Sequence, residues 1–273
     1  MHATLMIEIG WLALLGAIEL AAAQWERRTN GHTRKLRNIS FAVVNHIAMP
    51  PITLFLISAL GSRFGTHWAA SLPWPLALTA AILALDFAGY WFHRASHEIE
   101  FLWRFHQVHH MDEDLDFTTG TRVHLAEAVL HQILLVAVVV ALGVPRSCFT
   151  AYATISFLIA IFHHSNIAIP RPVERVLRLV LFTPLTHGTH HHDLIDNNQS
   201  NYGFILPWWD RMFGTYNKLD LQPEWRVGVS YSGDLKFLRL MFAPFAPTPL
   251  WEFEAPAGAT NAEKSNPALE KAA

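Results

Sequence analysis

Residues 72–110, LPWPLALTAAILALDFAGYWFHRASHEIEFLWRFHQVHH, decide how this chain folds. The first part of the stretch, Leu72–Phe92, is apolar apart from one charged residue, Asp86. A helix of about 20 apolar residues crosses the hydrocarbon core of a bilayer, so this run is long enough to span it. The second part carries histidines at positions 93, 97, 106, 109 and 110. The stretch therefore predicts a membrane helix that leads directly into a group of imidazoles at one membrane surface.

Four other apolar runs extend this prediction to the rest of the chain, and they cover Leu5–Gln24, Phe41–Leu60, Leu125–Val144 and Ser147–His164. Of the 273 residues, 52% are hydrophobic and only 15% are charged, whereas soluble domains carry about 25% charged residues. We therefore predict an all-α integral membrane protein with about four to five transmembrane helices and a cytosolic histidine-rich helical cap. The composition excludes a disordered chain, and a net charge of −2 gives no field that would attract nucleic acid.

The first apolar run has two interpretations. Ala21, Ala22 and Ala23 would suit the cleavage site of a signal peptide. No Lys or Arg precedes the run, however, and Glu8 and Glu19 interrupt it. These features favour a membrane span that is retained.

The basic residues predict the orientation of the spans. Five of them lie in residues 24–37, between the first two spans, whereas the loops on the opposite side hold only Arg63 and Arg146. Because Lys and Arg are enriched in cytoplasmic loops, we expect residues 24–37 to be cytoplasmic. Counting spans from there places the histidine-rich segments on the cytoplasmic side as well.

The histidines form three clusters whose spacing is typical of metal ligands on helices. His93 and His97 are four residues apart and share a helix face. Two further clusters repeat the pattern H-x-x-H-H, at 106–110 and at 187–191. Neutral imidazole is the commonest protein metal ligand, and a chain whose only cysteine is Cys148 cannot build a thiolate site. We expect the remaining isolated histidines to be ordinary packed or solvated residues: His2, His32, His46, His67 and His131.

At these clusters the chain resembles the membrane-bound fatty acid hydroxylase superfamily, also called the sterol desaturase family. The three clusters are similar to its histidine boxes. The segment Asp86–Arg94 resembles the lead into the first box, and Pro184 stands three residues before His187. Asn201-Tyr202-Gly203, followed by residues 209–216, WDRMFGTY, is similar to the closing segment of the family. The resemblance covers about residues 72–218.

The resemblance implies two iron ions held by the boxes, with ligands His93, His97, His106, His109, His110, His187, His190 and His191. It also implies ligands outside the boxes. His124 matches an H-x-x-E element, and His163 or His164 matches a histidine at the end of the last span, with the choice between these two left open. Ile159 departs from the pattern, because some fatty acid hydroxylases have a further ligand at that position.

Two carboxylates are candidates for orienting these imidazoles. Asp86 lies seven residues before His93 on the same helix face, and Glu127 lies three residues after His124. A metal-bound imidazole usually donates its second N–H to an acceptor, often a carboxylate. A carboxylate within a span is also costly, which points to a function. For Asp86 the alternative is pairing with Arg94 or with a backbone group.

These features predict an iron-dependent oxidoreductase that hydroxylates a lipid, either fatty acyl, sterol or related, using dioxygen and an external electron-transfer protein. No flavin, haem or dinucleotide motif is visible in the sequence. A desaturase with the same diiron centre is the nearest alternative. A non-catalytic membrane metal-binding protein is disfavoured because the imidazoles gather at one end of the spans. A zinc hydrolase is disfavoured because the H-E-x-x-H pattern is absent.

The expected organisation has four parts. Residues 1–71 form an N-terminal transmembrane region with the basic loop, and residues 72–218 form the histidine-box domain. Residues 219–254 are expected at the membrane interface, and residues 255–273, rich in Ala, Pro, Glu and Lys, are expected to be disordered. The chain ends Glu-Lys-Ala-Ala without a Lys-rich retrieval signal, which favours a bacterial inner membrane over the endoplasmic reticulum.

Overall fold

The computed structural model describes residues 2–25, 31–193, 195–220, 226–229 and 236–246. Within these ranges the chain is helical and contains no strand, only two isolated β-bridges. This confirms the all-α prediction. The tail at 255–273 lies outside the described residues.

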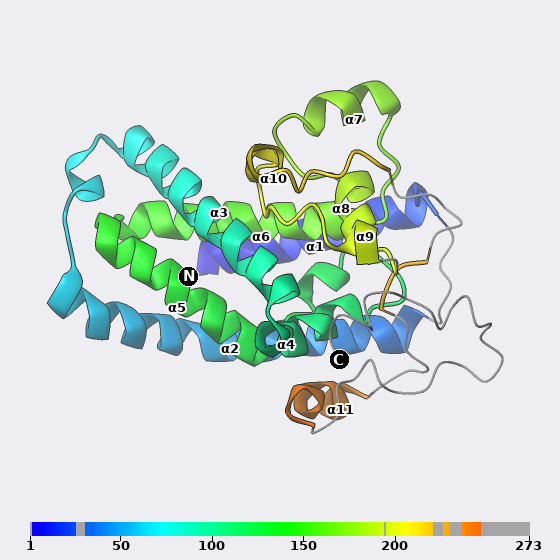
Figure 1. Cartoon of the computed structure of the whole chain (residues 1–273), viewed down its shortest axis with the longest axis horizontal. Helices are drawn as coiled ribbons and strands as arrows, with labels where there is room; N and C mark the ends of the chain where they lie inside the picture. The colour runs from blue at the N-terminus through cyan, green and yellow to red at the C-terminus, as the bar shows by residue number, and fades with distance from the viewer. Residues whose placement is uncertain (1, 26–30, 194, 221–225, 230–235, 247–273) are drawn as a thin grey trace.

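Five helices are long and apolar enough to cross a membrane: α1 (His2–Ala21), α2 (Gly31–Phe64), α3 (Trp74–Glu98), α5 (Leu125–Leu142) and α6 (Arg146–His164). In Figure 1, α1, α2 and α6 run along the long axis of the molecule, and α3 and α5 run obliquely to it. Their positions follow the five apolar runs, as predicted. Many of their apolar side chains point outward, such as Ile47, Leu54 and Phe55 on α2, as expected of surfaces that face lipid.

Helix α2 differs from the sequence prediction at its start. It begins at Gly31, ten residues before the expected span, so half of the basic loop is helical. Its 34 residues correspond to about 51 Å, well beyond the hydrocarbon thickness of about 30 Å. The first turns therefore extend past the apolar layer, and Arg34 and Asn38 are buried there against the loop that follows residue 110.

Helices α3, α5 and α6 pack around a common apolar core. Leu85 on α3, Val139 on α5 and Tyr152 on α6 are among its buried members. Gly143 ends α5 with φ +64°, and its missing side chain allows the backbone of Thr66 to approach closely. This core holds α3 and α6, both of which carry histidines in their last turn.

Short helices gather at one end of the long ones. They include α4 (Glu100–His110), α8 (Pro184–His190) and α9 (Ile195–Asn198), which lie near the last turns of α3 and α6 (Figure 1). Thr183 caps α8 in a capping box with Thr186, and Pro184 occupies its first turn, so this seven-residue helix begins at a defined position. The third histidine box is thereby held rigidly against the end of α6.

Three other short helices lie outside this group: α7 (Arg171–Leu177), α10 (Trp208–Phe213) and α11 (Phe237–Phe242). Helices α7 and α10 lie on the opposite side of the molecule from α11 (Figure 1). Trp208 Nε1 donates a 2.9 Å hydrogen bond to the carbonyl of Leu179, which connects α10 to the turn that follows α7.

Candidate metal centre

Nine histidines lie in two groups of ring nitrogens that could each hold a metal ion. The first group contains His93, His97, His106, His110 and His190. The second contains His109, His164, His187 and His191. Within each group the candidate ligand atoms lie within 4.8 Å of one another, and every ring is buried. The end of the helix bundle thus presents two adjacent imidazole cages.

The two H-x-x-H-H boxes each contribute to both groups. His106 and His110 enter the first group, and His109 between them enters the second. Neighbouring residues on a helix point about 100° apart, so adjacent histidines cannot face the same centre, whereas residues four apart can. The third box does the same with His187 and His191 in the second group and His190 in the first. The doubled histidine in each box therefore connects two sites.

The Nε2 atoms of the second group are in mutual contact. His164 Nε2 lies 3.0 Å from His109 Nε2, 3.0 Å from His187 Nε2 and 3.1 Å from His191 Nε2. With a metal–imidazole bond of about 2.1 Å, ligands at 90° are about 3.0 Å apart, and ligands at the tetrahedral angle are about 3.4 Å apart. The spacing thus fits a centre whose ligands are close to right angles.

In two rings of the second group, the N–H proton is on Nδ1, away from the Nε2 atoms that face one another. His164 Nδ1 donates to the carbonyl of Ala160 at 2.6 Å, and His109 Nδ1 donates to the carbonyl of Arg122 at 3.3 Å. A neutral imidazole has one N–H, so the facing Nε2 atoms both carry lone pairs. Two lone pairs at 3.0 Å repel unless a cation lies between them, and these residues therefore fit a bound metal.

The first group shows the same arrangement. His93 Nδ1 donates to the carbonyl of Tyr202 at 2.7 Å, and His106 Nδ1 donates to Glu127 Oε1 at 2.6 Å. Their Nε2 atoms face each other at 3.0 Å. In the same group, His97 Nε2 and His190 Nε2 are buried without a hydrogen-bond partner among the residues described. Unpaired buried nitrogens that converge on one point again fit a cation.

Burial also keeps these rings neutral. It lowers the pKa of His190 to about 3, with the neighbouring His106 contributing. Burial and the surrounding imidazoles likewise hold the pKa of His109, His110, His187 and His191 well below the usual value of 6.5. Since only the neutral form offers a lone pair, the rings are ready to bind metal at neutral pH.

Two of the expected ligands lie outside both groups. His124 caps α5: its Nδ1 accepts from the backbone of Ala126 at 3.1 Å, and its Nε2 lies 3.0 Å from the carbonyl of Met241. Both nitrogens are therefore used by the backbone. His163 packs its ring on His187, with centroids 3.9 Å apart, and does not join the second group. Of the two histidines that end α6, only His164 belongs to one of the two groups.

The two candidate carboxylates behave differently. Glu127 contacts His106 directly, as given above. Asp86 instead accepts hydrogen bonds from the backbone of Ile205 and Leu206, at 2.9 and 3.1 Å, and from Trp209 Nε1 at 2.9 Å. These bonds correspond to the alternative in which Asp86 pairs with a backbone group.

Asp210 and the acidic loop after α4 are parts of the site that the sequence analysis does not single out. Asp210 accepts from the backbone of Tyr202 and of Gly203, both at 2.8 Å, and so holds the carbonyl that binds His93. Its signal in the sequence is its place in the closing segment that resembles the family.

In the acidic loop after α4, Asp112 and Asp116 form buried ion pairs with Arg34 on α2. Asp112 lies two residues after His110, so these pairs fix where the second box ends. The sequence carries no signal for them, because the pairs join residues about 80 positions apart.

Comparison with known proteins agrees with this geometry. The family model described as fatty acid hydroxylase matches residues 78–215. That range contains all nine grouped histidines together with Glu127, Asp86 and Asp210. No solved structure matches the chain.

Several characterised proteins are similar to the chain over this region. Alkylglycerol monooxygenase of Homo sapiens is 31% identical over 150 residues, which cover 54% of this chain and 32% of that protein. Ornithine lipid hydroxylase OlsE of Rhizobium tropici is 27% identical over 197 residues, 72% of this chain and 59% of that protein. Very-long-chain aldehyde decarbonylase GL1-6 of Oryza sativa subsp. indica is 27% identical over 188 residues, 64% of this chain and 28% of that protein. The chain spans about a third of the length of the alkylglycerol monooxygenases that it matches.

Proposed function

Because this chain belongs to the fatty acid hydroxylase family, we propose that it is a membrane-bound non-haem diiron oxygenase that hydroxylates a lipid C–H bond with dioxygen and external electrons. The observation that carries the proposal is the pair of imidazole groups whose Nε2 atoms converge at 3.0–3.2 Å. Residues 72–218 would form the catalytic domain.

In this proposal each group binds one iron. Imidazole ligands suit iron, zinc, copper and nickel. Structural zinc sites are almost always tetrahedral, whereas the contacts here correspond to ligands near 90°, which favours a centre with more than four positions. Such a centre can hold its imidazoles and still leave positions open for dioxygen.

The irons would supply the oxidising power that no side chain has. The residues of the chain hold and shape the centre. Glu127 and the carbonyl of Tyr202 each accept an Nδ1 proton, which fixes the ring orientation of His106 and His93. Trp103 packs against His97 with ring centroids 5.1 Å apart, and the ring of Tyr202 lies 5.8 Å from that of His190. These aromatic rings exclude water from the first group.

An apolar groove between α3 and α5 supports an alkyl chain as the part of the substrate that is oxidised. It has a volume of about 420 Å³, and its lining is Ala84, Phe87, Ala88, Trp91, Leu134, Val138, Ala141 and Leu142. All of these lie within membrane-spanning helices, so lipid chains have access to it. An alkyl chain is the ligand that such a surface accommodates.

Phe204 connects the first imidazole group with His131 on α5. Phe204 packs against both His93 and His131, with ring centroids 5.5 and 5.2 Å apart. Gly89, next to Ala88 of the groove, leaves room for Phe204 and for His131 Nε2, which a Cβ at that position would meet at 3.1 and 3.7 Å. His131 Nε2 itself is buried without a partner among the described residues, unlike an ordinary core histidine.

The names of the relatives support a lipid substrate, since alkylglycerols and ornithine lipids are both amphipathic lipids. We further propose that the centre lies on the cytoplasmic side, as the basic loop predicts, and that a separate electron-transfer protein reduces it there. A bacterial inner membrane is the proposed location. Nucleic acid has no part in this function.

Lipid analysis of cells that express the chain, beside cells that express the His109→Ala variant, tests the proposal. A lipid that gains one oxygen only with the intact chain supports it. A new double bond without added oxygen would favour the desaturase alternative. Identical lipid profiles, or a product that forms without dioxygen, would contradict both.

A further inference from the structure

Helix α7 exposes apolar side chains and buries one of its carboxylates. Glu174 is buried, with 1% of its surface exposed, whereas Val176 is 64% exposed. Val173, Leu179 and Val180 are exposed as well. A soluble helix packs its apolar stripe inward and turns its charges outward. An outer face of exposed Val and Leu side chains is instead that of a helix that contacts lipid.

The apolar face of α7 is continuous with surfaces that face the bilayer. Helix α10 adds the exposed side chains of Trp208 and Met212, and Trp208 is hydrogen-bonded to Leu179 at the end of the α7 segment. Phe213, also on α10, packs against Trp91 of α3 with ring centroids 5.1 Å apart. Trp91 is itself exposed on a membrane-spanning helix. The apolar surface thus runs from α3 across α10 to α7, which places both short helices at the membrane interface.

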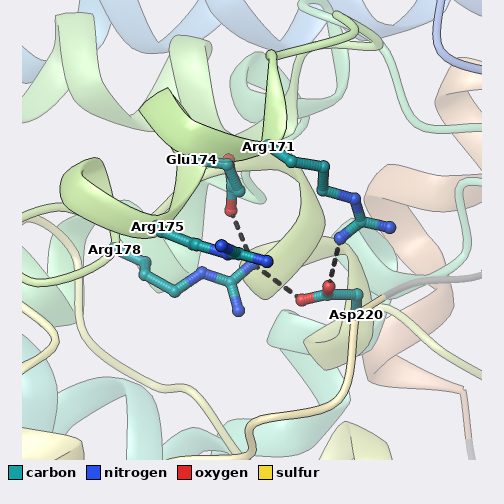
Figure 2. Close-up of a pocket in the computed structure, with 5 residues that line it drawn as sticks. All are labelled: Arg171, Glu174, Arg175, Arg178 and Asp220. Carbon is teal, nitrogen blue, oxygen red and sulfur yellow. Dashed lines mark hydrogen bonds and ion pairs between the residues drawn. The ribbon is translucent and has the colours of Figure 1, made fainter.

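A second face of α7 carries a row of arginines, of which Arg171 and Arg175 are exposed. Arg171, Arg175 and Arg178 are spaced four and three residues apart, on one side of the helix. Together with Glu174 and Asp220 they line a pocket of about 270 Å³. Figure 2 shows the three arginine side chains extending from α7 toward Asp220.

The acidic residues of the pocket are shared by two of the arginines. Asp220 pairs with Arg171 at 2.6 Å and with Arg178 at 2.7 Å. Glu174 pairs with Arg178 at 2.8 Å and also accepts from the hydroxyl of Thr183. Arg175 makes no ion pair or hydrogen bond within the described part of the chain. The pocket therefore has one more positive than negative charge, and its uncommitted guanidinium is Arg175.

We propose that α7 and α10 lie in the lipid interface and that the row Arg171, Arg175 and Arg178 binds the phosphodiester headgroup of an anionic glycerophospholipid. Guanidinium groups bind phosphate oxygens in a bidentate manner, and a basic pocket at the interface is the usual form of a headgroup site. The apolar surface beside the pocket would contact the acyl chains of the same lipid, which a free phosphate ion would not need.

The test uses the full chain, purified in detergent, with phosphatidylglycerol and phosphatidylcholine titrated separately and bound lipid counted by native mass spectrometry. We expect phosphatidylglycerol to bind more tightly than phosphatidylcholine. We expect Arg175→Gln to weaken phosphatidylglycerol binding about fivefold, the usual effect of one basic residue at an anionic surface. Asp220→Asn should strengthen it, because Arg171 and Arg178 then lose a competing carboxylate.

Lys236→Gln is the matched control, because Lys236 precedes α11 on the far side of the molecule and its loss removes the same charge. An equal loss in Lys236→Gln and Arg175→Gln would show general electrostatic attraction and overturn the site. Equal binding of the two lipids, or displacement of phosphatidylglycerol by millimolar inorganic phosphate, would also overturn it. Unchanged iron content and thermal midpoint in each variant verify that the chain is folded.

A spin label tests the placement of α7 separately. Val176→Cys is labelled in bilayers, where the only native cysteine, Cys148, is fully buried. Greater accessibility to oxygen than to a water-soluble nickel complex would support an interfacial helix. The opposite order would place α7 in water and contradict the proposal.

Discussion

Glu127 Oε1 lies 2.6 Å from His106 Nδ1, and the other nitrogen of the same ring faces His93 and His110 at 3.0 and 3.1 Å. One carboxylate on α5 thereby fixes the imidazole at the middle of the first group. Because the contact holds the proton on Nδ1, it leaves the Nε2 lone pair free for a metal.

We expect Glu127→Gln to weaken iron binding by the first group about 10- to 100-fold, the usual cost of losing such a partner. The amide still fills the space, so the fold should persist. Iron titration of the metal-free protein measures the effect. Glu100→Gln is the control, since Glu100 is exposed in a surface pair with Arg104. Equal affinity in Glu127→Gln and in the unmodified chain would contradict this role.

A second prediction concerns which histidines bind iron. His164→Ala should remove iron from the second group, and His109→Ala should do the same, with membrane insertion intact. His163→Ala and His124→Ala should both retain iron, although His124→Ala loses a helix cap worth about 1 kcal/mol. His46→Ala should change neither property. Iron analysis of the five variants decides the ligand set, and loss of iron in His124→Ala would restore it as a ligand.

The acidic loop predicts a dependence of stability on pH. Burial alone would raise the pKa of Asp116, but Arg34 and Lys35 beside it lower the pKa below its usual value of 3.8. A carboxyl with a lowered native pKa stabilises the fold above its unfolded pKa, and this stabilisation is lost as pH falls through the native value. Asp116→Asn should therefore lower stability at pH 7 by about 2 kcal/mol, somewhat less than for an isolated buried pair because Asp112 remains.

The thermal midpoints of the unmodified chain and of Asp116→Asn, measured at pH 7, 5 and 3.5, check this. We expect the difference between them to be constant from pH 7 to 5 and to shrink below about pH 4, where the carboxyl of the unfolded chain takes up a proton before the native one does. A difference that stays constant or grows at pH 3.5 would be inconsistent with the ion pairs.

The hydrogen bonds of Asp86 predict that replacing this carboxylate lowers the free energy of unfolding. Asp86→Asn should destabilise the chain by about 1.5–3 kcal/mol, the range for hydrogen bonds to a charged group, because three N–H donors lose a carboxylate acceptor. Iron binding by the first group should weaken less than in Glu127→Gln, since Asp86 acts through the 202–209 segment. Thermal unfolding and iron titration measure the two effects. Glu98→Gln, half-exposed, serves as control, and a normal midpoint in Asp86→Asn would refute the assignment.

Much of the fold could be predicted from local sequence. The length of the apolar runs predicts the five spans, and helix periodicity predicts that the histidines within each box lie near one another. Periodicity alone does not separate His109 from His106 and His110, because residues at i, i+3 and i+4 lie on the same side of a helix. In the structure His109 belongs to one group, and His106 and His110 belong to the other. The 100° between adjacent residues, applied to the doubled histidines, assigns His109 and His110 to different centres.

Other features depend on contacts between distant residues. The sequence places Arg34 in a basic loop that sets the orientation of the spans. In the structure Arg34 lies within α2 and is buried against Asp112 and Asp116. His124 follows the family pattern, yet its place at the start of α5 commits both nitrogens to backbone groups. The shared helix face predicts that Asp86 orients His93. It cannot show that the distant 205–209 segment donates hydrogen bonds to the Asp86 carboxylate.

The metal content of the purified chain tests the central claim most directly. The protein is isolated from cells grown with iron, and its iron and zinc are measured against protein by elemental mass spectrometry. Two imidazole groups, each holding one metal, predict about two irons per chain, falling in His109→Ala. A chain that is folded and active with no iron, or that holds only zinc while oxidising its lipid, would contradict the account.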